Sequence, residues 1–243
     1  MFIIYITAAI LITILIVWLI DKYNPKKYKP LILTSLWFVN FFLIYITVKS
    51  IIGPIMFNQV KEKRYKIVIE NLKDIRDSQL AHKTVTGKFQ NNWDSLVKFI
   101  ETEKFTITQR RDSTVIDKVL TRRYGVDTTK DIVIVDTLGF VAVIDSLFGV
   151  DTRYKTMMNV PVGKAGETFK LETGYISQNG QNMAVFEVSV DKSILFHDQD
   201  KNLVKIEKEV VSVEGVNGPS LKVGSMDEVN TNGNWPKNYS SEQ

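Results

Sequence analysis

The chain has no cysteine and only two histidines among its 243 residues. The absence of cysteine excludes a disulfide framework, a thiolate zinc site and a cysteine nucleophile. His82 and His197 lie far apart in the sequence, and neither has the spacing that metal-binding helices use. The polar segment 197–200 is expected to be a turn. We predict no catalytic residues, no metal and no cofactor, so the protein is not expected to be an enzyme.

The first part of the chain lacks charge: residues 2–20 contain no charged residue. This apolar run, at about 1.5 Å per residue, nearly crosses a hydrocarbon core of about 30 Å. A second apolar run covers residues 31–52 and has a single charge, Lys49, near its end. We interpret the two runs as transmembrane helices, joined into an antiparallel hairpin by the polar linker 21–30.

Two alternatives exist for these runs. A cleaved signal peptide would carry positive charge before an apolar stretch of about 7–15 residues, whereas residues 2–20 are longer and uncharged. A buried hairpin of a water-soluble protein would need other segments to cover both helices on every face. The membrane interpretation is therefore preferred.

The lysines near the apolar runs indicate an orientation. Positive charge favours the cytoplasmic side of a membrane. No lysine or arginine precedes the first run. The linker, in contrast, carries four lysines: Lys22, Lys26, Lys27 and Lys29. A second basic group, in residues 61–66, argues the other way, but whole domains translocate largely regardless of charge. We predict a cytoplasmic linker, with the N-terminus and the C-terminal domain in the periplasm of a bacterial inner membrane.

The polar residue Asn40 lies near the middle of the second run, where an amide without a partner is costly. We predict that it bonds to Thr13 or Thr7 of the first run, or to another subunit. No ionisable residue lies at depth in either run, so we expect an anchor and not a channel. At the end of the second run, Gly53 and Pro54 are expected to break or kink the helix and act as a hinge.

A helical stem is predicted after the anchor, and Gly87 is its expected end. Polar and apolar residues that share one helical face recur at steps of three and four: Tyr65, Val68, Leu72, Ile75, Gln79 and His82. Ile67 and Ile69 are expected to widen this stripe. A second, short helix is predicted to start at Asn92. The resulting domains are a transmembrane hairpin (1–57), a helical stem (58–103) and a β-rich extracytoplasmic head (104–243).

The head has the alternating pattern of strands. Residues 169–175 and 184–190 alternate around Asn179-Gly180, which predicts a β-hairpin. Shorter strands are expected at 105–108, 132–135 and 220–223. Residues 203–211 fit either a helix or a strand, and the spacing in 225–228 predicts a helical turn. The predicted fold class is a membrane-anchored α+β protein with an antiparallel sheet.

One part of the stem resembles a known family. Residues 74–82, then Gly87-Lys88-Phe89, then the helix 93–100 resemble the stems of type IV pilins and pseudopilins, with His82 in place of their aromatic residue. The resemblance implies a membrane helix that continues into a soluble stem. Two apolar runs replace the family's one, so a polymerising pilin is not expected. More broadly, the chain resembles two-span envelope proteins of the Bacteroidota, which implies a bacterial envelope setting.

These features lead to a hypothesis of function. We expect a non-catalytic structural or interaction subunit of a cell-envelope assembly, such as one for secretion or motility. Its partners would be the lipid bilayer and other envelope proteins or a second copy. Residues 58–243 carry 26 charges of each sign, so no nucleic-acid partner is expected. The alternatives are a tethered binding or sensing module for a peptide, glycan or lipid, and a hydrolase with an acid–base pair assembled by folding.

Overall fold

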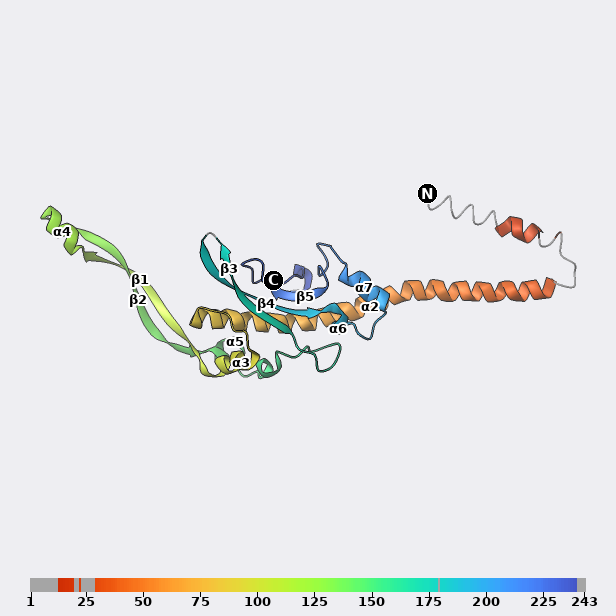
Figure 1. Cartoon of the computed structure of the whole chain (residues 1–243), viewed down its shortest axis with the longest axis horizontal. Helices are drawn as coiled ribbons and strands as arrows, with labels where there is room; N and C mark the ends of the chain where they lie inside the picture. Colours follow the sequence, from red (N-terminus) through yellow and green to blue (C-terminus); the bar gives the residue numbers. More distant parts are fainter. Residues whose placement is uncertain (1–12, 20–21, 23–28, 179, 240–243) are drawn as a thin grey trace. The chain divides into compact units, whose positions relative to one another are not determined.

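The computed structural model describes residues 13–19, 22, 29–178 and 180–239 (Figure 1). The chain divides into two compact units, Met1–Asn58 and Gln59–Gln243. It combines a long apolar helix near the N-terminus with two antiparallel β-sheets, which is an α+β class.

The first unit contains the N-terminal part of helix α2, which covers Lys29–Thr86. The large apolar side chains between residues 33 and 56 are exposed to solvent. Among the described residues, one helix, Leu33–Thr86, is long and apolar enough to cross a membrane. This helix is compatible with a transmembrane anchor. Most of the first predicted run lies outside the described residues, so the helical hairpin stays a prediction.

Helix α2 continues through Gly53 and Pro54, so a break at these residues is excluded, while the alternative of a kink stays a prediction. A proline inside a helix removes one backbone hydrogen bond and crowds the preceding turn, but the helical residues before and after Pro54 belong to one continuous helix. A hinge role for the two residues stays a prediction.

The C-terminal part of α2 supplies the core of the second unit. The six residues of the predicted stripe are all buried, and Ile69 is buried beside them. Ile67 was expected in the same stripe, but it is 44% exposed and lines an open pocket with Arg153 and Pro161. Helix α2 ends where predicted: Gly87 has φ 81° and its N–H bonds to the carbonyl of Lys83 at 2.8 Å.

Helix α3 (Trp93–Thr102) follows the turn and begins as the sequence predicts. The Asn92 side chain caps it by accepting a hydrogen bond from the backbone N–H of Ser95 at 2.9 Å. Leu96, Phe99 and Ile100 are buried on one face of the helix. Helix α3 thus contributes a second layer to the core.

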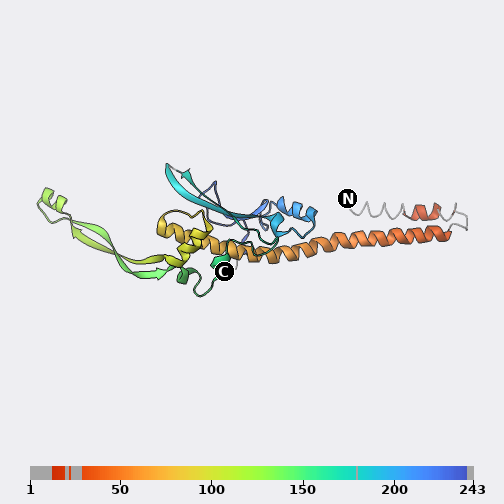
Figure 2. The same cartoon turned by 60° about the horizontal axis from the view of Figure 1, so that its bottom comes forward.

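The first sheet contains two long strands, β1 (Lys104–Ile116) and β2 (Thr129–Ala142), which pair in antiparallel fashion. The sequence predicted only short strands at 105–108 and 132–135. Helix α4 (Lys118–Tyr124) connects the strands at the far end of this hairpin, which extends away from the rest of the second unit (Figures 1 and 2). We call residues 104–142 the arm.

The second sheet has the order β3-β4-β5 and is antiparallel throughout. The predicted hairpin is confirmed, because β3 (Lys170–Gln178) pairs with β4 (Gln181–Asp191) around Gly180, which has φ 77°. Strand β5 (Ser220–Gly224) is also confirmed. The remaining elements are α5 (Val143–Leu147), η1 (Arg153–Thr156), α6 (Lys192–Leu195), α7 (Lys201–Lys208) and η2 (Lys237–Tyr239).

Two C-terminal predictions have different outcomes. The ambiguous segment 203–211 is helical over most of its length, as part of α7. Residues 225–228 do not form the predicted helical turn. The Ser225 hydroxyl still accepts hydrogen bonds from the backbone N–H groups of Asp227 and Glu228, so the capping contacts form without a helix behind them.

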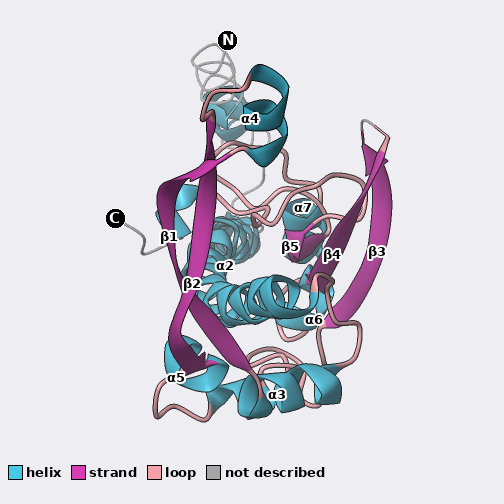
Figure 3. Ribbon diagram, turned by 90° about the vertical axis from the view of Figure 1, so that its left-hand side faces the viewer, coloured by secondary structure: helices cyan, strands magenta, loops and turns pink. Residues whose placement is uncertain are grey.

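The second sheet lies beside α2, and Figure 3 shows the two sheets as separate ribbons. Alternate residues of β4, including Phe186 and Val188, are buried. The ring of Phe186 contacts that of Phe89, which follows α2, with a centroid distance of 4.6 Å. The core of the second unit is therefore built from both the predicted stem and the predicted head.

Candidate functional site

The arm exposes large apolar side chains along its length, and Phe140 is 65% exposed. The exposed large apolar residues of the arm are Ile107, Ile116, Val119, Tyr124, Val126, Val133, Val135, Leu138 and Phe140. Exposed large apolar side chains that gather on one element commonly mark a site of protein or membrane interaction. The arm is thus the first candidate for a functional surface.

The strand register places several of these residues on one face. Val133, Val135 and Phe140 lie opposite alternate residues of β1, so the three side chains point to the same side of the hairpin. A register shift next to Ile107 leaves Leu138 as the extra residue of a bulge. The opposite face carries residues such as Ile134 that are half-buried. The face of β2 with Val133, Val135 and Phe140 is therefore the more exposed of the two.

The outer edges of the arm are open as well. In the described part of the chain, β1 and β2 pair only with each other, so each strand has an outer edge that no strand covers. Unpaired backbone N–H and C=O groups along such an edge can accept a strand from another protein. The arm consequently offers both an apolar face and main-chain hydrogen-bonding groups.

The tip of the arm is folded by local contacts. Asp117 caps α4 by accepting hydrogen bonds from the N–H groups of Val119 and Leu120. The hydrogen bond from Leu120, with that from Val119, lowers the pKa of the Asp117 carboxyl. Gly125 ends the helix with φ 70°. The tip is thus a defined structure that could present Tyr124 to a partner.

A buried polar cluster attaches α6 and α7 to α2. We call it the Glu207 cluster, and its members are Lys61, Tyr65, Lys192 and Glu207. The Glu207 carboxylate accepts hydrogen bonds from the Tyr65 hydroxyl at 2.9 Å and from the Lys61 ammonium at 3.0 Å. The Lys192 Nζ lies 3.4 Å from the same carboxylate and also donates to the carbonyls of Glu207 (2.6 Å) and Val216 (2.8 Å).

The environment of the Glu207 cluster favours a structural role. Burial raises the pKa of the Tyr65 hydroxyl well above its usual value, and the Glu207 charge adds to this effect. Burial also lowers the pKa of Lys192, while Glu207 opposes that shift. No buried side-chain nitrogen or oxygen among the described residues lacks a hydrogen-bond partner. We therefore interpret the cluster as an internal clamp whose groups satisfy one another.

A second clamp lies beside it and involves the turn at residues 197–200. The Arg64 guanidinium donates two hydrogen bonds to the Asp198 carboxylate, at 2.5 and 2.7 Å, and another to the carbonyl of Leu195. These bonds hold the pKa of Asp198 well below its usual range. Asp200 caps α7 through the N–H groups of Asn202 and Leu203. Both acidic residues of the turn thus have structural partners.

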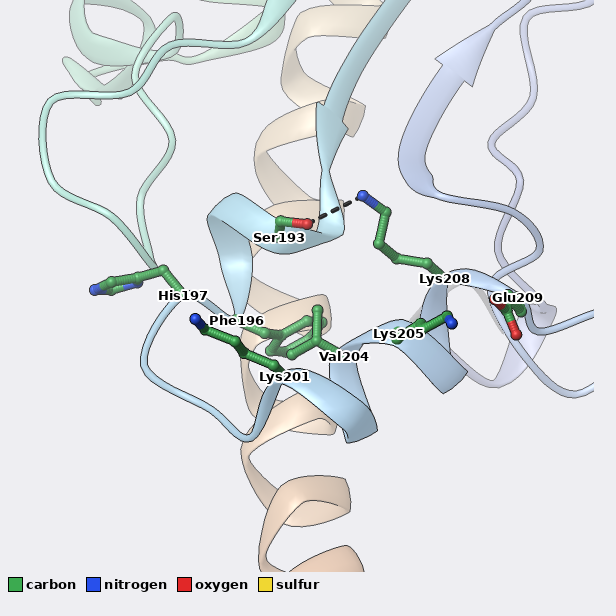
Figure 4. A pocket seen from close by; sticks show the side chains of 8 residues that line it. All are labelled: Ser193, Phe196, His197, Lys201, Val204, Lys205, Lys208 and Glu209. Atoms are coloured by element: carbon green, nitrogen blue, oxygen red, sulfur yellow. Dashed lines mark hydrogen bonds between the residues drawn. The ribbon is translucent and has the colours of Figure 1, made fainter.

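An open groove lies between α6 and α7, with a volume of about 520 Å³ (Figure 4). Its lining residues are Ser193, Phe196, His197, Lys201, Val204, Lys205, Lys208 and Glu209. Phe196 and Val204 are buried and form an apolar floor, while the lysines stand around it. No sequence pattern predicted this groove, although the spacing of Lys201, Lys205 and Lys208 already places them on one face of α7.

The residues proposed for contacts inside the membrane stay untested. Asn40 is exposed on α2. Thr13 lies in the helical segment 13–19, and Thr7 lies outside the described residues. Pairing of Asn40 with either threonine is therefore still a prediction.

The residues that carry the pilin-like pattern have structural roles at the turn after α2. The Gln79 side-chain amide donates to the carbonyl of Gln90 at 2.7 Å and accepts from its N–H at 2.9 Å. His82 Nδ1 lies 2.7 Å from the carbonyl of Lys88, and its ring contacts Phe99 at 4.7 Å. These buried polar groups hold the turn and α3 against α2. They are occupied by internal contacts and do not form an open site.

The chain was compared with known proteins in three ways. A scan against protein-family models, a search of curated proteins and a search of solved structures each found no match. The resemblances to type IV pilins and to two-span envelope proteins therefore stay expectations.

Proposed function

We propose that this protein is a membrane-anchored, non-catalytic interaction subunit of a bacterial cell-envelope assembly, and that the arm is the part that contacts the partner. The observation that carries the proposal is a long two-stranded hairpin with an exposed apolar face and two open edges. The partner would be another envelope protein or a second copy of the chain.

The energetics of the arm support this role. A two-stranded hairpin is marginally stable in water without a further layer. Complete burial of a large apolar side chain contributes about 1.5–3 kcal/mol relative to exposure. A partner that covers Val133, Val135 and Phe140 would therefore both bind tightly and stabilise the hairpin.

The anchor supports the proposed location. The exposed apolar part of α2 matches what a lipid bilayer requires. The lysines of the linker 21–30 favour a cytoplasmic linker, which would place the second unit in the periplasm of an inner membrane. The bilayer would then be the first partner and an envelope protein the second.

Site-specific photo-crosslinking in native membranes tests the proposal. The full chain would carry a photoreactive residue at Phe140 or Val133, and the matched control would carry it at Lys98, an exposed position of α3. We expect discrete adducts of defined mass from the arm positions, to be identified by mass spectrometry. An adduct yield at Phe140 no greater than that at Lys98 would contradict the role of the arm.

The alternative function, a tethered binding module, is supported by one feature. The groove between α6 and α7 combines an apolar floor with exposed lysines, which fits an anionic ligand better than a neutral glycan. This feature does not compete with the arm, because the two surfaces involve different residues.

A further inference from the structure

We propose that the groove between α6 and α7 binds the phosphate headgroup of an anionic lipid from the membrane that holds the anchor. This inference rests on the proposed membrane anchoring, but it does not depend on the arm or its partner. It assigns a ligand class to a surface that the interaction role does not use.

Two of the lysines that line the groove, Lys201 and Lys205, have no acidic partner among the described residues. Lys201 and Lys205 lie on successive turns of α7, and both side chains are exposed. In the described part of the chain, neither of them forms an ion pair. His197 stands on the Lys201 side of the groove, in the loop that follows α6 (Figure 4). Lys201 extends toward His197, and Lys205 extends the other way (Figure 4). A phosphate on the Lys201 side would meet that ammonium, and the flexible Lys205 side chain would have to turn toward it.

The acidic groups near the groove are mostly neutralised by other residues. Lys208 bonds to both carboxylate oxygens of Asp191 at 3.0 Å, and Arg64 holds Asp198. Glu207 is buried in its own cluster with two lysines. Among the lining residues, this leaves Glu209 as the acidic group at the rim. Lys201 and Lys205 therefore give the groove a net positive charge.

The groove is attached to residues that follow the apolar stretch closely in the sequence. The groove elements bond to Lys61 and Arg64 of α2 through Glu207 and Asp198. Lys61 follows Met56, an exposed apolar residue at the end of the apolar stretch, by only five positions. Five residues span at most about 18 Å even when fully extended. Lys61 is therefore separated from the end of the proposed membrane span by a short length of chain.

The same part of the chain carries further positive charge. Lys63 and Lys66 flank Arg64, and basic residues next to a membrane segment attract anionic lipids within a Debye length. A lipid in the same bilayer as the anchor is also present at a high effective concentration, whereas a free phosphate is not. These two arguments favour a headgroup over a soluble anion as the occupant.

The test uses the full chain in lipid nanodiscs. Hydrogen exchange of the α7 backbone would be measured in discs of phosphatidylcholine alone and in discs with an equal part of phosphatidylglycerol. We expect at least about threefold slower exchange with the anionic lipid, because bound ligand stabilises the segment that holds it. The double variant Lys201→Gln, Lys205→Gln should lose this difference, and Lys201→Arg, Lys205→Arg should keep it.

A charge-matched control separates the groove from general electrostatics. Lys88→Gln, Lys98→Gln removes two exposed lysines that follow the far end of α2, and we expect it to behave as the wild type. The lipid site would be overturned, with the anchor intact, if α7 exchanged at the same rate in both kinds of disc. The same conclusion would follow if the double glutamine variant kept the wild-type difference in exchange rate. Failure of the chain to enter discs would overturn the anchor and the lipid site together. Equal protection from inorganic phosphate in phosphatidylcholine discs would also overturn the lipid assignment.

Discussion

The two β-sheets of this protein are built alike, yet their surroundings differ. Each contains a long antiparallel hairpin, but four residues of β4 are buried, whereas no strand residue of the arm is. The β3-β4-β5 sheet has α2 beside it, and the arm has no second layer among the described residues. Strand pairing thus defines both hairpins. Whether a hairpin contributes to the core or offers a surface to a partner depends on whether another layer covers it.

We expect the largest loss of unfolding free energy from a substitution in the β3-β4-β5 sheet. Phe186→Ala would remove a fully buried ring that packs on Phe89. We expect a loss of about 4 kcal/mol in the free energy of unfolding, from lost transfer energy and a cavity. Urea unfolding of the full chain in detergent would measure it.

Phe140→Ala in the arm is the matched change, because it truncates the same side chain at an exposed position. Its effect on the unfolding free energy should stay within about 0.5 kcal/mol, while crosslinking to the partner should fall. Similar losses of stability in the two variants would contradict the conclusion that the second sheet is covered and the arm is not.

The second effect concerns the Glu207 cluster. Glu207→Gln keeps the shape of the side chain but removes the carboxylate that faces the buried Lys192 ammonium. Because an uncompensated buried charge is costly, we expect a loss of about 3 kcal/mol in the unfolding free energy. Glu209→Gln, an exposed change nearby, should be nearly neutral in the same urea titration. A neutral Glu207→Gln variant would show that the cluster does not hold α7.

A smaller loss of stability is expected from substitution of Gly224. At Gly224 the backbone has φ 76°, and a Cβ would come within 2.2 Å of the carbonyl oxygen of Phe186. Gly224→Ala should therefore destabilise the protein by about 2 kcal/mol, measured by thermal unfolding. Gly139→Ala in the arm meets no atom within 4 Å and should be tolerated. Equal effects at both positions would contradict the packing of β5 on β4.

The smallest effect is the acid response of the Arg64–Asp198 pair. Since the pKa of Asp198 is lowered in the folded state, its contribution is present above the unfolded value of about 3.9 and is lost as the pH falls below it. The carboxylate is partly exposed, so the contribution should be about 1 kcal/mol or less. Asp198→Asn should flatten the pH dependence of urea unfolding in this acid range, and Arg64→Gln should do the same. An unchanged slope in both variants would exclude the pair as its cause.

Local patterns were enough to predict several elements. The steps of three and four between Tyr65 and His82 identified the buried face of α2, and Gly87 identified its end. The Asn179-Gly180 pair identified the β3–β4 hairpin. These signals succeed because helix periodicity, a positive φ and a tight turn depend on neighbours in the sequence.

The candidate surfaces could not be predicted in the same way. The β-branched run 132–135 has the same character as the buried positions of β4, yet it lies on an uncovered arm. Lys192 looks like a surface residue in the sequence, but it is fully buried because Glu207 and two carbonyl groups surround its ammonium. Such outcomes depend on contacts between segments that are distant along the chain.

The apolar stretch, the amphipathic helix and the β3–β4 hairpin can thus be predicted from local sequence, since each depends on short-range spacing and backbone preference. Which sheet is covered, which lysine is buried and which lysines are exposed at the groove became evident only from the fold. Burial and charge pairing depend on which distant segments approach one another. In this protein, the second sheet and α3 lie around the C-terminal part of α2, and the arm stays uncovered.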